Sequence, residues 1–237
     1  MSFSIKNKKT LCSLSILIFA FTHSAQASEI VSKQQFVDIK LAIPSVVYDI
    51  RYASKNNFVG EVIDGYLAPK CLIRQEVIKP LIKLSDELLQ QGYRLKLYDC
   101  YRPEKAVKHF MRWALDLSDT KTKNTYYPNL DKSNLVGQYI AEKSGHSKGF
   151  TLDLTIQMKD KNGTWHDLDM GSTFDMFDKI SNTETPLISP QQKYNRQILK
   201  VTLERNGFTN YPMEWWHFTY TKTPKSQRQH AYNFDVL

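Results

Sequence analysis

The chain has 237 residues and a formal net charge of +8, with 41% hydrophobic and 12% aromatic residues. This length is sufficient for one domain with a hydrophobic core, and the sequence holds no repeat or low-complexity tract. The basic residues form no run that would indicate nucleic-acid binding, so a solvated, mildly basic surface explains them best.

Residues 1–27 have the features of a secretory signal peptide. Lysines lie near the start, a short apolar stretch follows over 11–21, and Ala25-Gln26-Ala27 is a typical cleavage site. The apolar stretch is too short to span a bilayer, and Cys12 lies at its beginning and not after it, which disfavours a lipid anchor. We expect a periplasmic or secreted domain over residues 28–237, with a net charge of +5 and no stable membrane insertion. A retained N-terminal anchor is the alternative.

The first half of the domain predicts a helix, a strand and a second helix. Apolar residues recur at helical spacing over 72–91, and Gly92 is a typical helix stop. Residues 93–98 then alternate between polar and apolar side chains, as a strand does. Pro103 is suited to a helix start, and the following helix is expected over 104–117.

The polar stretch 119–134 predicts a loop that is long enough to form a rim or lid over a site. Residues 150–157 alternate again, and Asp153 lies on the face opposite to the apolar side chains. Asn162-Gly163 is a strong hairpin signal, which predicts antiparallel strands over 152–158 and 164–169. It also fits a glycosylation pattern, but the turn explains it more simply.

A last helix is expected over 191–206, closed by Gly207. Helices against an antiparallel sheet predict an α+β fold in a single compact domain. Residues 211–220 are aromatic and typical of a strand. In a regular strand Glu214 and His217 would point to opposite faces, so we expect a bulge, a turn or a strand end at Trp215-Trp216.

Two short segments, 144–153 and 214–217, hold two histidines and two carboxylates. Three such ligands fill three corners of a tetrahedral zinc site and leave the fourth corner for water. The mixture of imidazole and carboxylate keeps net positive charge on the metal. A spare carboxylate, here Glu214, would be the general base. The expected ligands of one Zn²⁺ per chain are His146, Asp153 and His217.

Each of these residues by itself is better explained by a structural role. The combination favours the metal site, because Gly149 lets the chain bend between His146 and Asp153. No carboxylate pattern surrounds His109 or His166, so neither is a candidate ligand.

The spacing Ser-x-His-x-x-Gly-x-x-x-Asp, followed about 60 residues later by Glu-x-x-His, resembles zinc peptidases that trim D-amino acids from peptidoglycan. Further segments resemble the narrower family of VanX-type D-alanyl-D-alanine dipeptidases. They are Tyr48-Asp49-Ile50-Arg51-Tyr52-Ala53 with Asn57, Phe58 and Gly60, then Tyr98-Asp99-Cys100-Tyr101-Arg102-Pro103, Met170-Gly171-Ser172-Thr173-Phe174-Asp175, and Trp215-Trp216. The resemblance covers roughly residues 45–237.

The resemblance implies the compact fold that these peptidases share with the hedgehog signalling domain, and it assigns further site residues. Arg102 would hold the oxyanion, although sequence alone favours a salt bridge at a helix start. Asp175 would bind the ammonium group of a small D,D-dipeptide, with a helix-start role as an equal alternative. Ser144 would contact the substrate backbone. Trp216 or Trp215 is expected to pack beneath the metal ligands and not to bind substrate.

Without Cys12, an even pair of cysteines remains, Cys71 and Cys100. In an oxidising compartment such a pair predicts one disulfide, which would join a helix start to a strand end. Neither cysteine has the close-spaced partner typical of a zinc site.

The predicted function is hydrolysis of D-alanyl-D-alanine by a zinc-activated water. The first alternative is a zinc D,D- or L,D-carboxypeptidase acting on peptidoglycan stem peptides, which would share the metal ligands but need an open groove. The second is a zinc-binding module without activity. Glu214 and Arg102 argue against that module, because a structural zinc needs neither a base nor an oxyanion donor.

Overall fold

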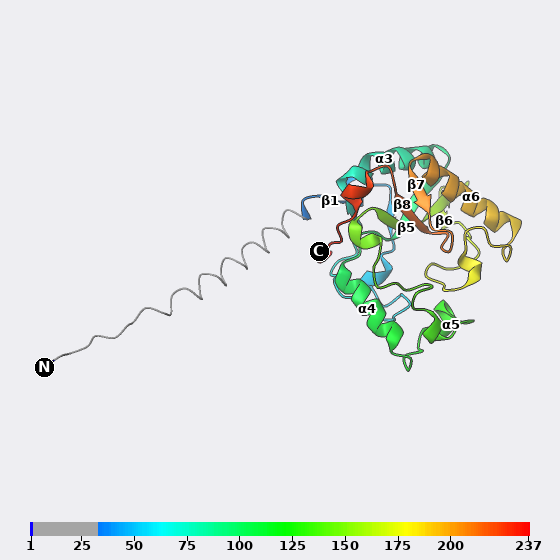
Figure 1. The fold of residues 1–237 in the computed structure, drawn as a ribbon. Helices are drawn as coiled ribbons and strands as arrows, with labels where there is room; N and C mark the ends of the chain where they lie inside the picture. The colour runs from blue at the N-terminus through cyan, green and yellow to red at the C-terminus, as the bar shows by residue number, and fades with distance from the viewer. Residues whose placement is uncertain (2–32) are drawn as a thin grey trace. The chain divides into compact units, whose positions relative to one another are not determined.

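A mixed six-stranded sheet forms the centre of the fold, in the order β2-β4-β5-β8-β7, with β6 paired to β5 (Figure 1). The β2–β4 pair is parallel and the other pairs are antiparallel. The strands are β2 (Val47–Tyr48), β4 (Tyr93–Asp99), β5 (Thr151–Lys159), β6 (Trp165–Asp167), β7 (Phe208–Asn210) and β8 (His217–Tyr220). A separate pair joins β1 (Phe36–Asp38) to β3 (Leu72–Arg74).

This computed structural model describes Met1 and residues 33–237, so the predicted signal peptide after Met1, with Cys12, lies outside the described residues. Residues 36–237 form one compact unit. Among residues 33–237, no helix is both long and apolar enough to cross a bilayer.

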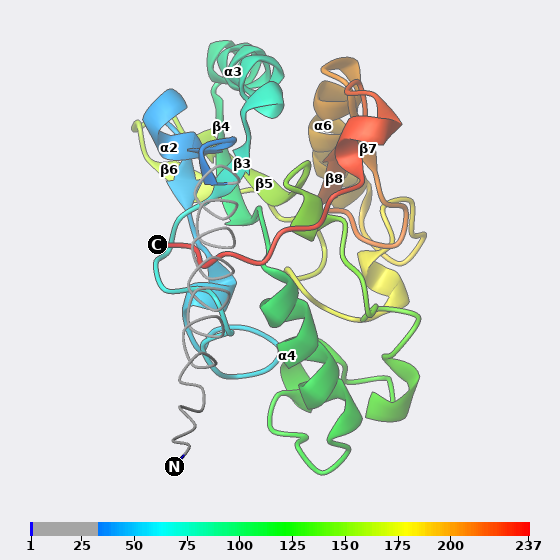
Figure 2. The same ribbon diagram turned by 60° about the vertical axis from the view of Figure 1, so that its left-hand side comes forward.

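Helices flank the sheet on two sides. Figures 1 and 2 show α3 and α6 together on one side and α4 on the other. The α-helices are α2 (Ile39–Ala42), α3 (Gln75–Gln90), α4 (Glu104–Leu115), α5 (Lys123–Tyr126) and α6 (Pro190–Arg205). Short 3₁₀ turns are η1 (Arg51–Ala53), η2 (Lys132–Asn134), η3 (His146–Lys148), η4 (Lys179–Ser181) and η5 (Lys225–Arg228). The predicted α+β fold class is confirmed.

Local sequence explains the long helices. In α3 one face is buried at helical spacing, through Val77, Leu81, Leu84 and Leu88. The helix ends before Gly92, whose φ of 81° lies in the left-handed region that glycine adopts freely. In α6 a capping box between Ser189 and Gln192 satisfies the first free N–H groups, and Pro190 occupies the first turn.

The helix predicted over 72–91 is wrong at its first three residues. Leu72 to Arg74 form β3, which pairs with β1, and Ile73 is fully buried there. The pairing with a distant segment overrides the local helical pattern. The helix predicted over 104–117 ends at Leu115, two residues early.

The predicted hairpin is confirmed, because β5 and β6 pair with Lys159 opposite Trp165. Its loop is longer than the two residues expected. The amide of Asp160 donates to the Thr164 carbonyl, and Gly163 takes a φ of 84° inside this loop. The strand β5 is buried over its first six residues, so it forms the middle of the core and carries Asp153 within it.

Candidate metal centre and active site

Adjacent strands bring two of the predicted zinc ligands together. Asp153 on β5 and His217, the first residue of β8, are direct cross-strand partners, so their side chains lie on the same face. His146 arrives from η3, which ends at Gly149 with a φ of 76°. A Cβ atom on Gly149 would collide with the ring of Phe36, so the bend between the ligands requires glycine.

The three donor atoms form a nearly equilateral triangle. His146 Nε2 lies 3.3 Å from His217 Nδ1 and 3.3 Å from Asp153 Oδ1, and His217 Nδ1 lies 3.1 Å from Asp153 Oδ1. Zinc bonds of about 2.0–2.1 Å in a tetrahedron place neighbouring ligand atoms about 3.3–3.4 Å apart. The buried Asp153 Oδ1 makes no hydrogen bond. This group of donors therefore fits a zinc ion.

A backbone contact orients His146. Its Nδ1 lies 2.7 Å from the carbonyl oxygen of Cys100, which can only accept a hydrogen bond. Nδ1 therefore carries the proton, and Nε2 keeps the lone pair that a metal needs. This contact was not foreseen from the sequence, although Cys100 lies in one of the segments that carried the resemblance.

Two histidines lie against the carboxyl group of Asp153. Burial alone would raise the pKa of its carboxyl group, but the two histidines outweigh this and hold the pKa well below its usual range. Asp153 is therefore a carboxylate, the form that binds a metal.

Glu214 lies in the turn that precedes β8. The amide of His217 donates to the carbonyl of Glu214, and Trp215-Trp216 form a turn, so the expected irregularity is confirmed as a strand end. One carboxyl oxygen of Glu214 lies 3.4 Å from Nδ1 of His217. Burial raises the pKa of Glu214 to about 7, with Asp153 adding to the effect and His217 and Arg102 opposing it. A carboxyl group with that pKa is suited to general-base chemistry near neutral pH.

Arg102 does form a salt bridge, as sequence alone favoured, but within the site. Its Nε and Nη2 lie 2.9 Å from Asp99 Oδ2, and Nη2 lies 3.4 Å from Asp153 Oδ2. The guanidinium also lies over the rings of Tyr52 and Phe110. Asp99 was not predicted as a site residue, although it lies three positions before Arg102 on the same segment.

A cavity of about 330 Å³ lies over these groups, between the sheet, α4 and the loops. The predicted site residues at its wall are Arg102, Ser144, His146, Asp153, Asp175, Glu214 and His217. Trp216 also lines it and is 1% exposed, in agreement with the expected packing beneath the ligands, whereas Trp215 donates to the hydroxyl of Ser172.

Asp175 is a buried carboxyl group in the cavity wall. It is 4% exposed, its φ of 62° lies in the left-handed region, and both carboxyl oxygens accept from the hydroxyl of Tyr52 at 3.0 and 3.1 Å. Burial and the charge of Asp153 raise the pKa of Asp175 well above its usual value. The helix-start alternative is wrong for Asp175, because Asp178 caps η4. Tyr52 was missed as a site residue.

The predicted rim over 119–134 is wrong. The cavity is lined instead by Ser144, Gly145 and residues of the next loop, 137–143. The hydroxyl of Ser144 accepts a hydrogen bond from the amide of His146, which joins this rim to a predicted ligand.

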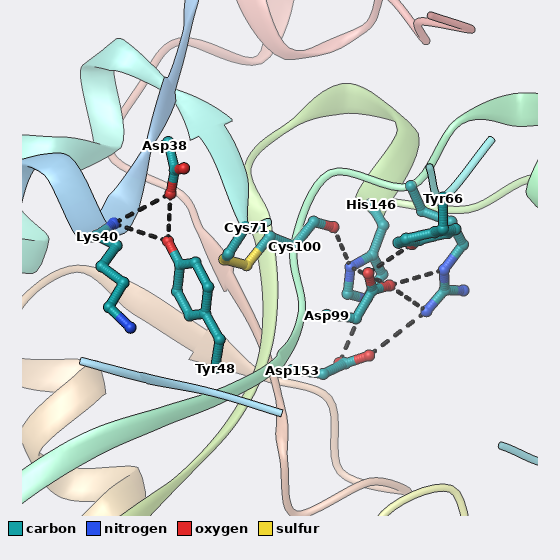
Figure 3. Close-up of a disulfide and its surroundings, with 10 residues drawn as sticks. Asp38, Lys40, Tyr48, Tyr66, Cys71, Asp99, Cys100, His146 and Asp153 are labelled. Atoms are coloured by element: carbon teal, nitrogen blue, oxygen red, sulfur yellow. Dashed lines mark hydrogen bonds and ion pairs between the residues drawn. A yellow bond between two sulfur atoms is a disulfide. The ribbon is translucent and has the colours of Figure 1, made fainter. Parts of the chain in front are cut away.

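Cys71 and Cys100 are joined by a disulfide, with Cα atoms 5.2 Å apart (Figure 3). Cys71 lies directly before β3, and not at a helix start as expected. Cys100 follows β4 and carries the carbonyl that orients His146.

Comparison with known proteins agrees with this geometry. The model of the peptidase family M15, described as D-Ala-D-Ala dipeptidase, matches residues 32–236. A D-alanyl-D-alanine dipeptidase of Enterococcus faecium is 37% identical, over 77% of this chain and 89% of that protein. Relatives of the same name from Enterococcus faecalis (35%; 80% of this chain, 93% of that protein) and Escherichia coli (29%; 78% and 83%) also match.

A solved structure of a mutant of the vancomycin-resistance D,D-pentapeptidase VanY, in complex with Zn(II), is 18% identical. It covers 65% of this chain and 76% of its own, with a TM-score of 0.40. The family model and the curated relatives cover most of the chain and match the resemblance seen in the sequence. The chain belongs to the D-Ala-D-Ala dipeptidase family of the M15 peptidases.

Proposed function

We propose that this protein is a zinc-dependent dipeptidase that hydrolyses D-alanyl-D-alanine to two molecules of D-alanine. The observation that carries the proposal is one small cavity that holds both the triangle of metal donors and the buried carboxyl group of Asp175. Family membership gives the substrate class. The site supplies one group for the ammonium charge of that substrate and others for hydrolysis of its peptide bond.

Each residue has a separate task in this proposal. His146, Asp153 and His217 would hold zinc, which when bound acidifies water and polarises the scissile carbonyl. Glu214 takes a proton from the attacking water and returns it to the leaving amine. Arg102, fixed by Asp99, donates hydrogen bonds to the oxyanion.

The preference for a dipeptide would come from its ammonium group. A free dipeptide has an ammonium group about one residue length, roughly 3–4 Å, from its scissile bond. Asp175 and Tyr52 form a buried acceptor pair for that ammonium group. A longer peptide has an amide nitrogen in place of this ammonium group, so it would lose the ion pair with Asp175. Ser144 at the rim is placed to contact the substrate backbone.

Export is a separate proposal. We infer that residues 1–27 are a cleaved signal peptide, that the mature domain covers 28–237 in the periplasm or outside the cell, and that the disulfide forms there. An exported dipeptidase meets D-Ala-D-Ala released from the cell wall and cannot reach the cytoplasmic precursor pool. Cell fractionation with N-terminal sequencing tests this. An uncleaved chain in the cytoplasm would refute it.

Hydrolysis assays on two substrates test the function. We expect the zinc-loaded mature protein to release D-alanine from D-Ala-D-Ala and not from a pentapeptide that ends in D-Ala-D-Ala. Release from the pentapeptide would instead indicate the carboxypeptidase, and release from neither would indicate a zinc-binding module without activity.

A further inference from the structure

Asp99 is a fully buried carboxyl group behind the cavity wall that contacts two parts of the site at once. Its Oδ2 lies 2.9 Å from Nε and Nη2 of Arg102 and 3.5 Å from Nδ1 of His146. One oxygen atom thereby contacts both the proposed oxyanion donor and a proposed metal ligand. The orientation of this carboxyl group therefore affects the positions of both Arg102 and His146.

The other oxygen of Asp99 is held by a tyrosine that does not line the cavity. The hydroxyl of Tyr66 donates to Asp99 Oδ1 over 2.5 Å, and Tyr66 is 2% exposed. Figure 3 shows Tyr66, Asp99, His146 and Asp153 as one connected group. A carboxyl group bonded through one oxygen can still rotate about its Cβ–Cγ bond, whereas bonds to both oxygens fix its plane.

The C-terminus fixes the position of Tyr66. The amide of Val236 donates to the carbonyl of Gly65, and the Val236 carbonyl accepts from the amides of Leu67 and Ala68, at 2.8–3.1 Å. The ring of Tyr66 packs edge-on against Tyr52. The hydroxyl is therefore held in a rigid frame and does not depend on a mobile side chain.

We propose that Tyr66 is a positioning residue of the active site, which acts through Asp99 to orient both Arg102 and His146. It contacts neither the proposed substrate nor the metal donors. Its effect on Arg102 rests on the proposed function, whereas its effect on His146 is measurable as metal affinity alone.

The test compares Tyr66→Phe with Tyr48→Phe. Tyr48 is a matched control, because its hydroxyl also donates to a carboxylate, Asp38 Oδ1, over 2.5 Å. That pair lies on the other side of the disulfide in Figure 3, away from His146. Each substitution removes one hydroxyl group and keeps the ring, so both variants are expected to fold.

We expect Tyr66→Phe to lower kcat for D-Ala-D-Ala about 10-fold with KM changed less than 2-fold. We also expect it to weaken zinc binding, measured by competition with a chromophoric chelator, by about 3- to 10-fold. Tyr48→Phe should match the wild type in both measurements. Equal behaviour of the two variants in zinc affinity and kcat would overturn the proposal. If the wild type does not cleave the dipeptide, the proposed function fails, and the zinc affinities still decide the role of Tyr66.

Discussion

Asp153 and Glu214 are two carboxyl groups in one cavity whose pKa values move in opposite directions. The histidines on both sides of Asp153 hold its pKa low, whereas burial raises the pKa of Glu214 to about 7. Such a separation supports the proposal that Asp153 binds the metal and Glu214 transfers the proton. The spacing of the sequence motifs indicated these roles, and the environment of each side chain gives the reason.

Glu214→Gln tests the base directly. The amide keeps the size of the side chain but cannot accept the proton, so we expect kcat for D-Ala-D-Ala to fall by at least about 1000-fold. Zinc content, measured by atomic emission, should stay near one per chain. Glu184→Gln, at an exposed glutamate bonded to Gln197, is the control. Turnover by Glu214→Gln near the wild-type rate would mean that another group is the base.

Asp175→Asn tests the ammonium site. It removes the carboxyl group that would ionise to pair with the bound ammonium group and preserves most of the shape, so kcat/KM for D-Ala-D-Ala should fall on the order of 100-fold, mainly through KM. Zinc affinity should change little. Substrate kinetics together with a chelator competition separate these effects. An unchanged KM would show that Asp175 does not recognise the substrate.

At the scale of elements, local periodicity predicted most helices and strands but not their long-range pairing. The alternation over 150–157 and the hairpin signal at Asn162-Gly163 gave β5 and β6, because both are local. Leu72 and Ile73 fit a helical pattern, and the pairing of β3 with β1 decided their structure. A single sequence holds no information on that pairing.

In the site, too, local sequence predicted some residues, and others depend on long-range contacts. The ligand types and their spacing predicted His146, Asp153 and His217, whose donor atoms the fold brings together. Glu214 and His217 would point to opposite faces of a regular strand, and this correctly predicted an irregularity between them, without indicating that it would be a strand end. Asp99 and Tyr52 were missed, because their importance comes from contacts with Arg102 and Asp175 made by the folded chain. The rim was assigned to the wrong loop, since polar composition does not reveal which loop folds over a cavity.

The disulfide is expected to affect both the stability of the fold and the metal site. Cys71 and Cys100 are separated by 29 positions, and closing such a loop stabilises a protein by roughly 3–4 kcal/mol. We expect the double variant Cys71→Ser/Cys100→Ser to lose stability of this order in urea denaturation. Its zinc binding should also weaken, because the Cys100 carbonyl orients His146.

Unfolding in the presence of a reducing agent is the control for the double variant. The reducing agent should destabilise the wild-type protein and leave the double variant unchanged. A wild-type unfolding curve that does not respond to reductant, with both thiols free under native conditions, would show that the disulfide does not form.

At the scale of the whole molecule, metal binding and folding are coupled. The three donors come from η3, β5 and β8, so zinc would bind the folded chain far better than the unfolded one. At 1000 times its Kd, such a ligand adds about 4 kcal/mol of stability. For a domain of this size we expect chelation to lower Tm by roughly 10 °C. His217→Ala should show no such response, measured by thermal unfolding with and without zinc.

The most direct test of the account is a zinc titration of the metal-free mature protein, followed by release of D-alanine from D-Ala-D-Ala. We expect activity to rise linearly and reach its plateau at one zinc per chain, and to be absent at all zinc concentrations in His217→Ala. Full activity in the presence of excess chelator, or a plateau that needs two zinc ions per chain, would contradict a single catalytic zinc held by His146, Asp153 and His217.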